Sequence, residues 1–136
     1  MQPNKHGLSY LSVSDHVLIQ VAEGSWNLPT AEEYGRQIKQ MVQDKLPPKW
    51  VLFIDLRKWQ FCPPEVWDYF DELYLWLANN GMIGQVLLCD TTMMKHFVTG
   101  LDARAGNPLP FGQFICDNYD DALEWCQQQR PRCLEN

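Results

Sequence analysis

Thiol, imidazole and carboxyl side chains that could carry chemistry occur around the apolar stretches of this 136-residue chain. Covalent catalysis needs a nucleophile, a base and a group that orients the base. Cys62 or Cys89 could act as the nucleophile, His96 as the base and Asp55 as the orienting carboxylate. Nothing in the spacing of these residues requires them to meet, so we expect a protein that is not an enzyme.

A binding site is a second use for polar residues that follow buried strands. The carboxyl ends of parallel strands form the usual ligand-binding edge of an open α/β sheet. Asp55 and Asp90 also suit plain hydrogen bonding in loops and helix caps, which is the simpler interpretation. The polar residues expected at this edge are Asp55, Arg57, Asp90, Thr91, Thr92 and His96.

The sequence lacks the spacings that hold metals, nucleotides or disulfides. Its five cysteines are an odd number without a CxxC pair, which argues against zinc and against a disulfide framework. Its glycines form neither a GxGxxG nor a P-loop motif. His6 and His16 are isolated from other candidate ligands. We therefore expect no metal and no cofactor.

Charge and composition exclude several kinds of partner. The formal net charge is -6 and the basic residues are scattered, which argues against nucleic acid and anionic membrane surfaces. No apolar run approaches the roughly 20 residues of a membrane-spanning helix. The first residues lack the apolar core of a signal peptide. We expect one domain over residues 1–136, in a cytoplasmic setting with reduced thiols.

The stretch from Trp50 to Gly81 predicts a buried strand followed by a helix. The apolar run Val51–Ile54 is too short for a buried helix and suits a strand covered on both faces. We expect this strand to end at Leu56 and residues 57–62 to form a loop. Pro63 and Pro64 suit a helix entry. Its inner face recurs at helical spacing, at Val66, Phe70, Leu73 and Leu77.

The remaining patterns predict a β-β-α-β-α-β-α-β-α order. A hairpin is expected from residues 7–13 and 16–22, followed by a helix with Thr30 as its N-cap and Glu33 completing a capping box. Strand 84–89, a helix from Thr91 to about Leu101 capped by Asp90, and strand 113–116 follow. A last helix is capped by Asp117 or Asn118. This order implies an α/β fold with a mostly parallel sheet and flanking helices.

Aromatic residues make a second stripe on the helix after the central strand. Trp67 and Tyr74 fall outside its inner face, and Trp59 precedes the helix. One interpretation is a helix half-buried under a loop. The other is an exposed aromatic patch that binds a partner or a second copy of the chain.

The order of elements and several short motifs resemble the STAS superfamily, the domain of anti-sigma factor antagonists and sulfate transporter tails. The likeness runs from about Tyr10 to Gln127. More specifically, the chain looks like an uncharacterised bacterial branch of that fold. The order carries most of the likeness. The motifs are Gly24-Ser25-Trp26-Asn27, Asp55-Leu56-Arg57-Lys58-Trp59, Pro64-Glu65-Val66-Trp67, Asp90-Thr91-Thr92 and Asp121-Ala122-Leu123-Glu124-Trp125.

One departure from that family changes what the resemblance implies. Phospho-switched antagonists carry a phosphorylatable hydroxyl where the chain enters the helix after the central strand. The matching stretch here is Phe61-Cys62-Pro63-Pro64, which has no hydroxyl. The resemblance therefore implies docking without that switch. Thr91 and Thr92 are the nearest hydroxyls in a similar setting, where capping is the simpler role.

Two functions remain open. The first is a non-catalytic regulatory or protein-interaction module that self-associates or binds a partner protein, with Trp59, Trp67 and Tyr74 exposed. The second is a carrier or sensor of a small apolar or acidic ligand held between sheet and helices. Neither involves nucleic acid or membrane insertion. The candidate binding residues are Trp59, Cys62, Pro63, Trp67, Tyr74, Asp90 and Thr91.

Overall fold

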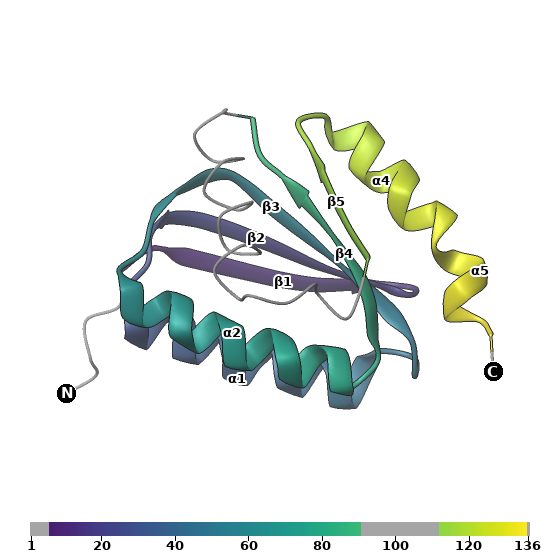
Figure 1. Ribbon diagram of the computed structural model, residues 1–136, viewed down its shortest axis with the longest axis horizontal. Coiled ribbons are helices and arrows are strands. Elements are labelled where there is room, and N and C mark those ends of the chain that lie inside the picture. Colours follow the sequence, from purple (N-terminus) through teal and green to yellow (C-terminus); the bar gives the residue numbers. More distant parts are fainter. Residues whose placement is uncertain (1–5, 91–111, 136) are drawn as a thin grey trace.

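The computed structural model describes residues 6–90 and 112–135 of the chain, which form an α/β fold (Figure 1). The expected helix 91–101 and Thr91 lie outside the described residues. Elsewhere the predicted order of elements and the fold class are confirmed. The elements are β1 (Leu8–Ser14), β2 (Val17–Ser25), α1 (Leu28–Lys45), β3 (Trp50–Phe61), α2 (Pro64–Asn79), β4 (Met82–Leu88), β5 (Gly112–Cys116), α4 (Tyr119–Gln128) and α5 (Arg130–Cys133).

The described strands form one sheet in the order β1-β2-β3-β4-β5. The hairpin pair β1 and β2 is antiparallel, whereas the other three neighbouring pairs are parallel. Helices α1 and α2 cover one face and α4 covers the other (Figure 1). The predicted hairpin followed by parallel strand–helix units is therefore the observed topology.

Strand β3 is buried on both faces, as its apolar run predicts. Leu52 and Ile54 point into the core beneath α1 and α2, whereas Val51 and Phe53 point into the core beneath α4. This alternation follows from the two-residue period of a strand. Side chains 50 to 53 are at most 1% exposed. One strand therefore joins the two apolar cores.

The predicted inner face of α2 is buried, and the helix begins and ends at the expected residues. Pro63 is the N-cap and Pro64 is the first helical residue. The chain leaves the helix through Asn80 and Gly81, and Gly81 has a φ of 105° that favours glycine. Trp50 fixes this exit, because its Nε1 donates to the carbonyl of Asn80 at 3.1 Å.

The predicted loop over residues 57–62 is wrong, because β3 continues to Phe61. Strand β2 also continues to Ser25 instead of ending near Ala22, so the two strands pair further than expected. The register shifts between Val21 and Glu23, where β3 holds one extra residue, as in a β-bulge. The sequence pattern missed this extension because polar residues replace the apolar run there.

The predicted N-cap of α1 is also wrong. Asn27 caps the helix, and its Oδ1 accepts from the backbone N–H of Thr30 at 3.2 Å. Thr30 is instead buried in the first turn, and its hydroxyl donates to the carbonyl of His6 at 2.7 Å. Pro29 follows the cap, so the helix starts one turn earlier than a capping box at Thr30 implies. For the last helix, the predicted cap Asn118 is confirmed.

Among the residues that the structure describes, no helix is both long and apolar enough to span a bilayer.

Leucines on opposite faces of α2 test the packing of this layer. Replacing Leu77, which is fully buried, by alanine should lower the free energy of unfolding by about 2–5 kcal/mol, because it leaves a cavity. Replacing Leu75, which is 58% exposed, should change it by less than about 0.5 kcal/mol. Urea unfolding of both variants checks this, and equal losses would contradict the packing described.

Candidate functional site

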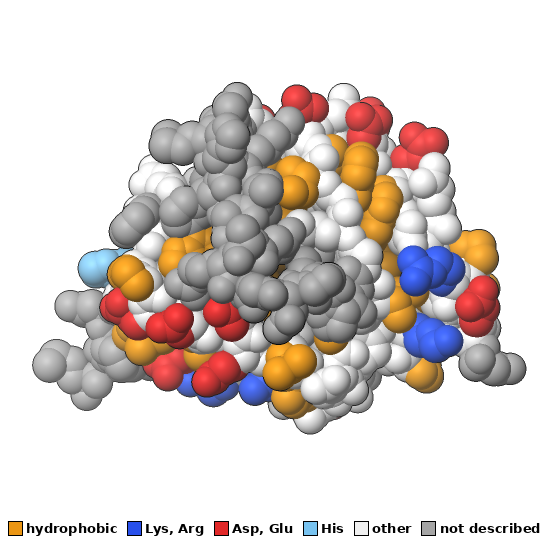
Figure 2. Space-filling view, in the orientation of Figure 1, with side chains coloured by type: hydrophobic (Ala, Val, Ile, Leu, Met, Phe, Trp, Pro, Cys, Tyr) orange, Lys and Arg blue, Asp and Glu red, His pale blue; other side chains and the backbone are white. Residues whose placement is uncertain are grey.

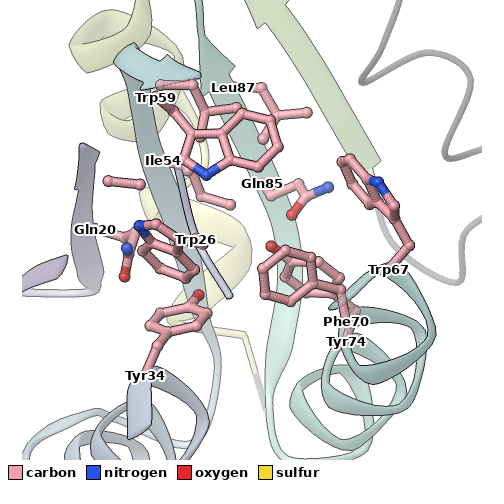
Figure 3. Close-up of a pocket in the computed structure, with 12 residues that line it drawn as sticks. Gln20, Trp26, Tyr34, Ile54, Trp59, Trp67, Phe70, Tyr74, Gln85 and Leu87 are labelled. Carbon is pink, nitrogen blue, oxygen red and sulfur yellow. The ribbon is translucent and has the colours of Figure 1, made fainter. Parts of the chain in front are cut away.

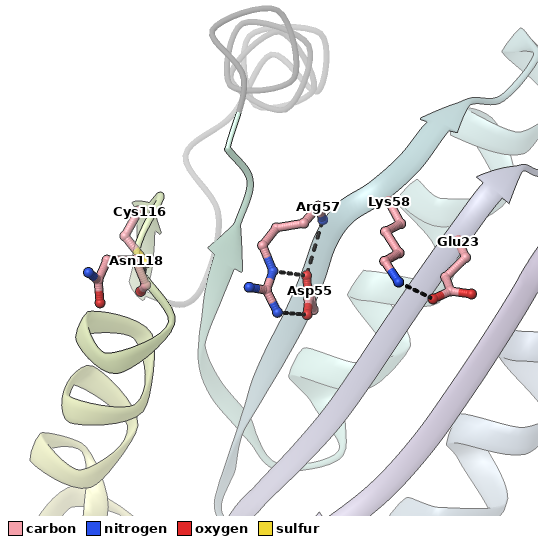
Figure 4. Close-up of polar contacts among 6 residues, drawn as sticks. All are labelled: Glu23, Asp55, Arg57, Lys58, Cys116 and Asn118. Carbon is pink, nitrogen blue, oxygen red and sulfur yellow. Dashed lines mark hydrogen bonds and ion pairs between the residues drawn. The ribbon is translucent and has the colours of Figure 1, made fainter.

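The bulge in β3 gathers charged side chains at the carboxyl end of the parallel strands. Asp55 is 8% exposed and accepts two hydrogen bonds from the guanidinium of Arg57, at 3.0 Å from Nε and 2.8 Å from Nη2 (Figure 4). The backbone N–H of Arg57 donates to the same carboxylate at 3.1 Å. Hydrogen bonding to Asp55 raises the pKa of Arg57 above its ordinary value. Three hydrogen bonds therefore hold the two side chains in one geometry.

A depression of about 460 Å³ lies beside this ion pair. Lys58 Nζ is 3.9 Å from Glu23 on the neighbouring strand (Figure 4), and the Arg57 guanidinium lies 5.5 Å from the centre of the Tyr119 ring. Lys58 is exposed, so this longer ion pair contributes little to stability. We call this site the carboxyl-end depression; its lining residues are Val21, Glu23, Asp55, Arg57, Lys58 and Asp90.

The carboxyl-end depression suits binding better than catalysis. Its described lining contains neither a thiol nor an imidazole. The two thiols considered as nucleophiles are buried, Cys62 at 1% and Cys89 at 0% exposure, and His96 lies outside the described residues. Mixed carboxylates and cations at an exposed edge can instead form ion pairs with a charged partner.

A second concavity lies on the opposite face of the sheet, between β3, β4 and the two helices. It has a volume of about 50 Å³, and half of its lining residues are aromatic (Figure 3). The Trp59 and Trp67 rings meet edge-on at 5.7 Å, and Trp67 meets Phe70 at 5.9 Å. We call this site the aromatic cavity; its lining residues are Gln20, Ala22, Trp26, Tyr34, Ile54, Leu56, Trp59, Trp67, Phe70, Tyr74, Gln85 and Leu87.

Two buried polar atoms in the aromatic cavity have no hydrogen-bond partner in the described part of the protein. They are the hydroxyl of Tyr34 and Oε1 of Gln85. The Gln85 amide is held from its other side, where Nε2 donates to Gln113 at 2.6 Å. Burial, followed by the nearby Tyr74, raises the pKa of Tyr34 well above its ordinary value. The hydroxyl is therefore neutral, and its interacting neighbour is the side chain of Tyr74.

The described binding residues that the sequence predicted lie in the aromatic cavity, at the carboxyl-end depression and at the start of α2. Trp59 is 6% exposed and Trp67 and Tyr74 are half-buried, so the predicted exposed patch of these three rings is wrong. They line the aromatic cavity instead, because the bulge turns Trp59 toward α2. Asp90 is exposed at the carboxyl-end depression. Cys62 is buried and Pro63 is half-buried at the start of α2.

Sequence reasoning missed several residues of both sites. Gln20 and Gln85 are polar residues at inward positions of apolar strands, a signal that could have been noticed. Glu23 and Lys58 were missed because the strands that pair them were predicted to end earlier.

The unpartnered hydroxyl gives a stability prediction. Replacing Tyr34 by phenylalanine should leave the free energy of unfolding unchanged or raise it by up to about 1 kcal/mol, because no hydrogen bond of good geometry is lost. Replacing Thr30 by valine, which removes a bonded hydroxyl, should lower it by about 1 kcal/mol. Urea unfolding compares the two, and a larger loss for the tyrosine variant would contradict the geometry.

Comparisons with known proteins place the fold. No family model and no curated protein sequence matches the chain. An uncharacterized protein of the DUF3478 family from Shewanella loihica, described as having a SpoIIAA-like fold, is similar with a TM-score of 0.65 and 16% identity, over 93% of this chain and 98% of that chain.

Two further similar structures are anti-sigma factor antagonists. One is from Mycobacterium paratuberculosis, with a TM-score of 0.58 and 23% identity over 89% of this chain and 94% of that one. The other is SpoIIAA in its unphosphorylated form, with a TM-score of 0.58 and 13% identity over 90% and 98%. The chain therefore has the STAS-like fold of the anti-sigma factor antagonists, as its sequence resemblance implied.

Proposed function

We propose that the chain is a non-catalytic regulatory module that docks onto a partner protein through its carboxyl-end depression. The observation that carries this proposal is the fixed Asp55–Arg57 pair beside exposed charges, at the carboxyl end of the parallel strands. Two proteins of similar fold are described as anti-sigma factor antagonists, which supports a docking role. Because one fold serves many functions, docking is inferred chiefly from the chemistry of the depression.

The surface chemistry favours a protein partner. Glu23 and Asp90 present carboxylates, whereas Arg57 and Lys58 present cations within the same depression. Paired charges of both signs give specificity and register in protein docking. On the face seen in Figure 2, described basic side chains are interspersed with acidic ones instead of forming a broad basic patch. Nucleic acid would select such a patch.

The start of α2 supports docking without a phosphorylation switch at this position. Cys62 is buried, Pro63 is the N-cap and Pro64 is the first helical residue, so no hydroxyl stands there. A phosphate at a helix N-terminus acts through its added charge. In this module the affinity for the partner is instead set by the fixed charges of the depression.

A charge reversal tests the proposal. Immobilised wild-type chain is used to capture partners from the source organism, and mass spectrometry identifies them. Replacing Lys58 by glutamate adds negative charge to the depression and should weaken binding of the captured protein at least about tenfold, a loss of about 1.4 kcal/mol.

Lys45 provides the matched control. It is exposed in the last turn of α1, at the opposite end of the parallel strands (Figure 1). Replacing Lys45 by glutamate makes the same charge change and should leave the affinity unchanged. The proposal is overturned if the Lys58 variant binds as tightly as wild type, or if both variants lose binding equally.

A second candidate function is binding of a small neutral molecule in the aromatic cavity. The specific observation is the unpartnered Oε1 of Gln85 inside a largely apolar lining. No described cation lines this cavity, so a carboxylate would be buried without a counter-charge. A volume of about 50 Å³ admits only a guest of a few heavy atoms, which excludes a fatty acid.

Native mass spectrometry checks this candidate. The wild-type chain should carry a small added mass that is lost on denaturation. The Gln85→Leu variant should not, because it lacks the acceptor that the guest needs. Thermal unfolding confirms that the variant is folded. A wild-type mass that equals the bare chain, or an added mass kept by the variant, would rule this function out.

A further inference from the structure

Strand β1 is the terminal strand of the sheet, with only β2 beside it among the described residues. It lies on the outer side of β2 in Figure 1. Its sequence, Leu-Ser-Tyr-Leu-Ser-Val-Ser, contains no charged residue and no proline. Natural proteins commonly protect an edge strand with charge, proline or a bulge, because its outer backbone groups otherwise invite pairing. None of these devices is present in β1.

The side chains of β1 also favour pairing with a further strand. Leu8 is 54% and Tyr10 is 52% exposed, and both side chains lie on the row that is turned away from α1. The alternate row consists of Ser9, Leu11 and Val13, which are half-buried. Leu11 and Val13 pack against the core beneath α1 and α2. An additional strand beside β1 would therefore extend the core on one face and cover the exposed apolar side chains on the other.

We propose that β1 pairs antiparallel with β1 of a second copy of this chain, across a two-fold axis that passes through Leu11. The strand has seven residues, so this register sets Leu11 opposite Leu11 of the second copy. Tyr10 is then opposite Ser12 of the second copy, and the two Tyr10 rings are diagonal neighbours. The two sheets become one continuous sheet.

Charge favours a second copy as the occupant. Each copy carries a formal charge of -6, so association through most surfaces brings like charges together. All seven residues of β1 are uncharged. At the turn that follows, the Asp15 carboxylate is already paired with Arg130 at 3.3 Å. The strand is therefore a surface on which two copies can meet with little electrostatic cost.

The two-fold arrangement also matches side chains by exposure. Residues opposite each other in an antiparallel pair point to the same face of the sheet. The half-buried row of one copy therefore meets the half-buried row of the other, and the exposed row meets the exposed row. This self-complementarity is what an isologous interface requires.

Sedimentation equilibrium of the full chain over a range of concentrations tests the proposal. Wild type should form a dimer. The Ser12→Lys variant sets like charges across the two-fold axis on an otherwise uncharged edge, which should weaken the dimer at least about tenfold. Ser12 is exposed in one copy, so the variant should fold as wild type does, which thermal unfolding verifies.

Leu75→Lys on α2 is the control, because it puts the same charge on an exposed site away from β1. It should dimerise as wild type does. Hydrogen exchange of backbone amides should show slower exchange in β1 for the dimer than for the Ser12→Lys monomer. A wild type that stays monomeric, a Ser12→Lys chain that dimerises fully, or a dimer lost only in Leu75→Lys would each overturn the proposal.

Discussion

Burial of β3 on both faces is the constraint on which the rest of the structure depends. Leu52 and Ile54 belong to one core, and Val51 and Phe53 belong to the other. A strand with two apolar faces is stable only between two helical layers. The same strand continues beyond this buried segment, so the residues after Ile54 are carried to fixed places at the carboxyl end of the sheet. Both candidate sites are consequences of this continuation.

The bulge opposite Ala22 decides which face each of those residues reaches. Without an extra residue, strict alternation would place Arg57 and Lys58 on opposite faces. With it, Asp55, Arg57 and Lys58 share the carboxyl-end depression, whereas Trp59 reaches the aromatic cavity. One local irregularity therefore separates a charged site from an aromatic one. The charged site lies at an exposed edge suited to a protein partner, and the aromatic one holds the unpartnered oxygen of Gln85.

Much of the fold could be predicted from local pattern, because the apolar periods of β3 and α2 directly reflect two-sided and one-sided burial. The sequence predictions failed where strands and helices begin or end in polar residues. The extension of β3 to Phe61 depends on pairing with β2, and long-range pairing leaves little trace in a polar stretch. The cap at Asn27 competed with a plausible motif at Thr30, and tertiary contact with His6 decided between them. The exposure of Trp59 could not be predicted without the bulge.

The most direct measurement of the central claim is hydrogen exchange of the chain alone and in complex with its captured partner. The account predicts that slower exchange on binding is concentrated at the carboxyl ends of β2 and β3, around residues 21–23 and 55–58. The last turn of α1 lies at the opposite end of the parallel strands, so exchange there should be unchanged. Slower exchange confined to the end of α1, or to α5, would contradict docking at the carboxyl-end depression.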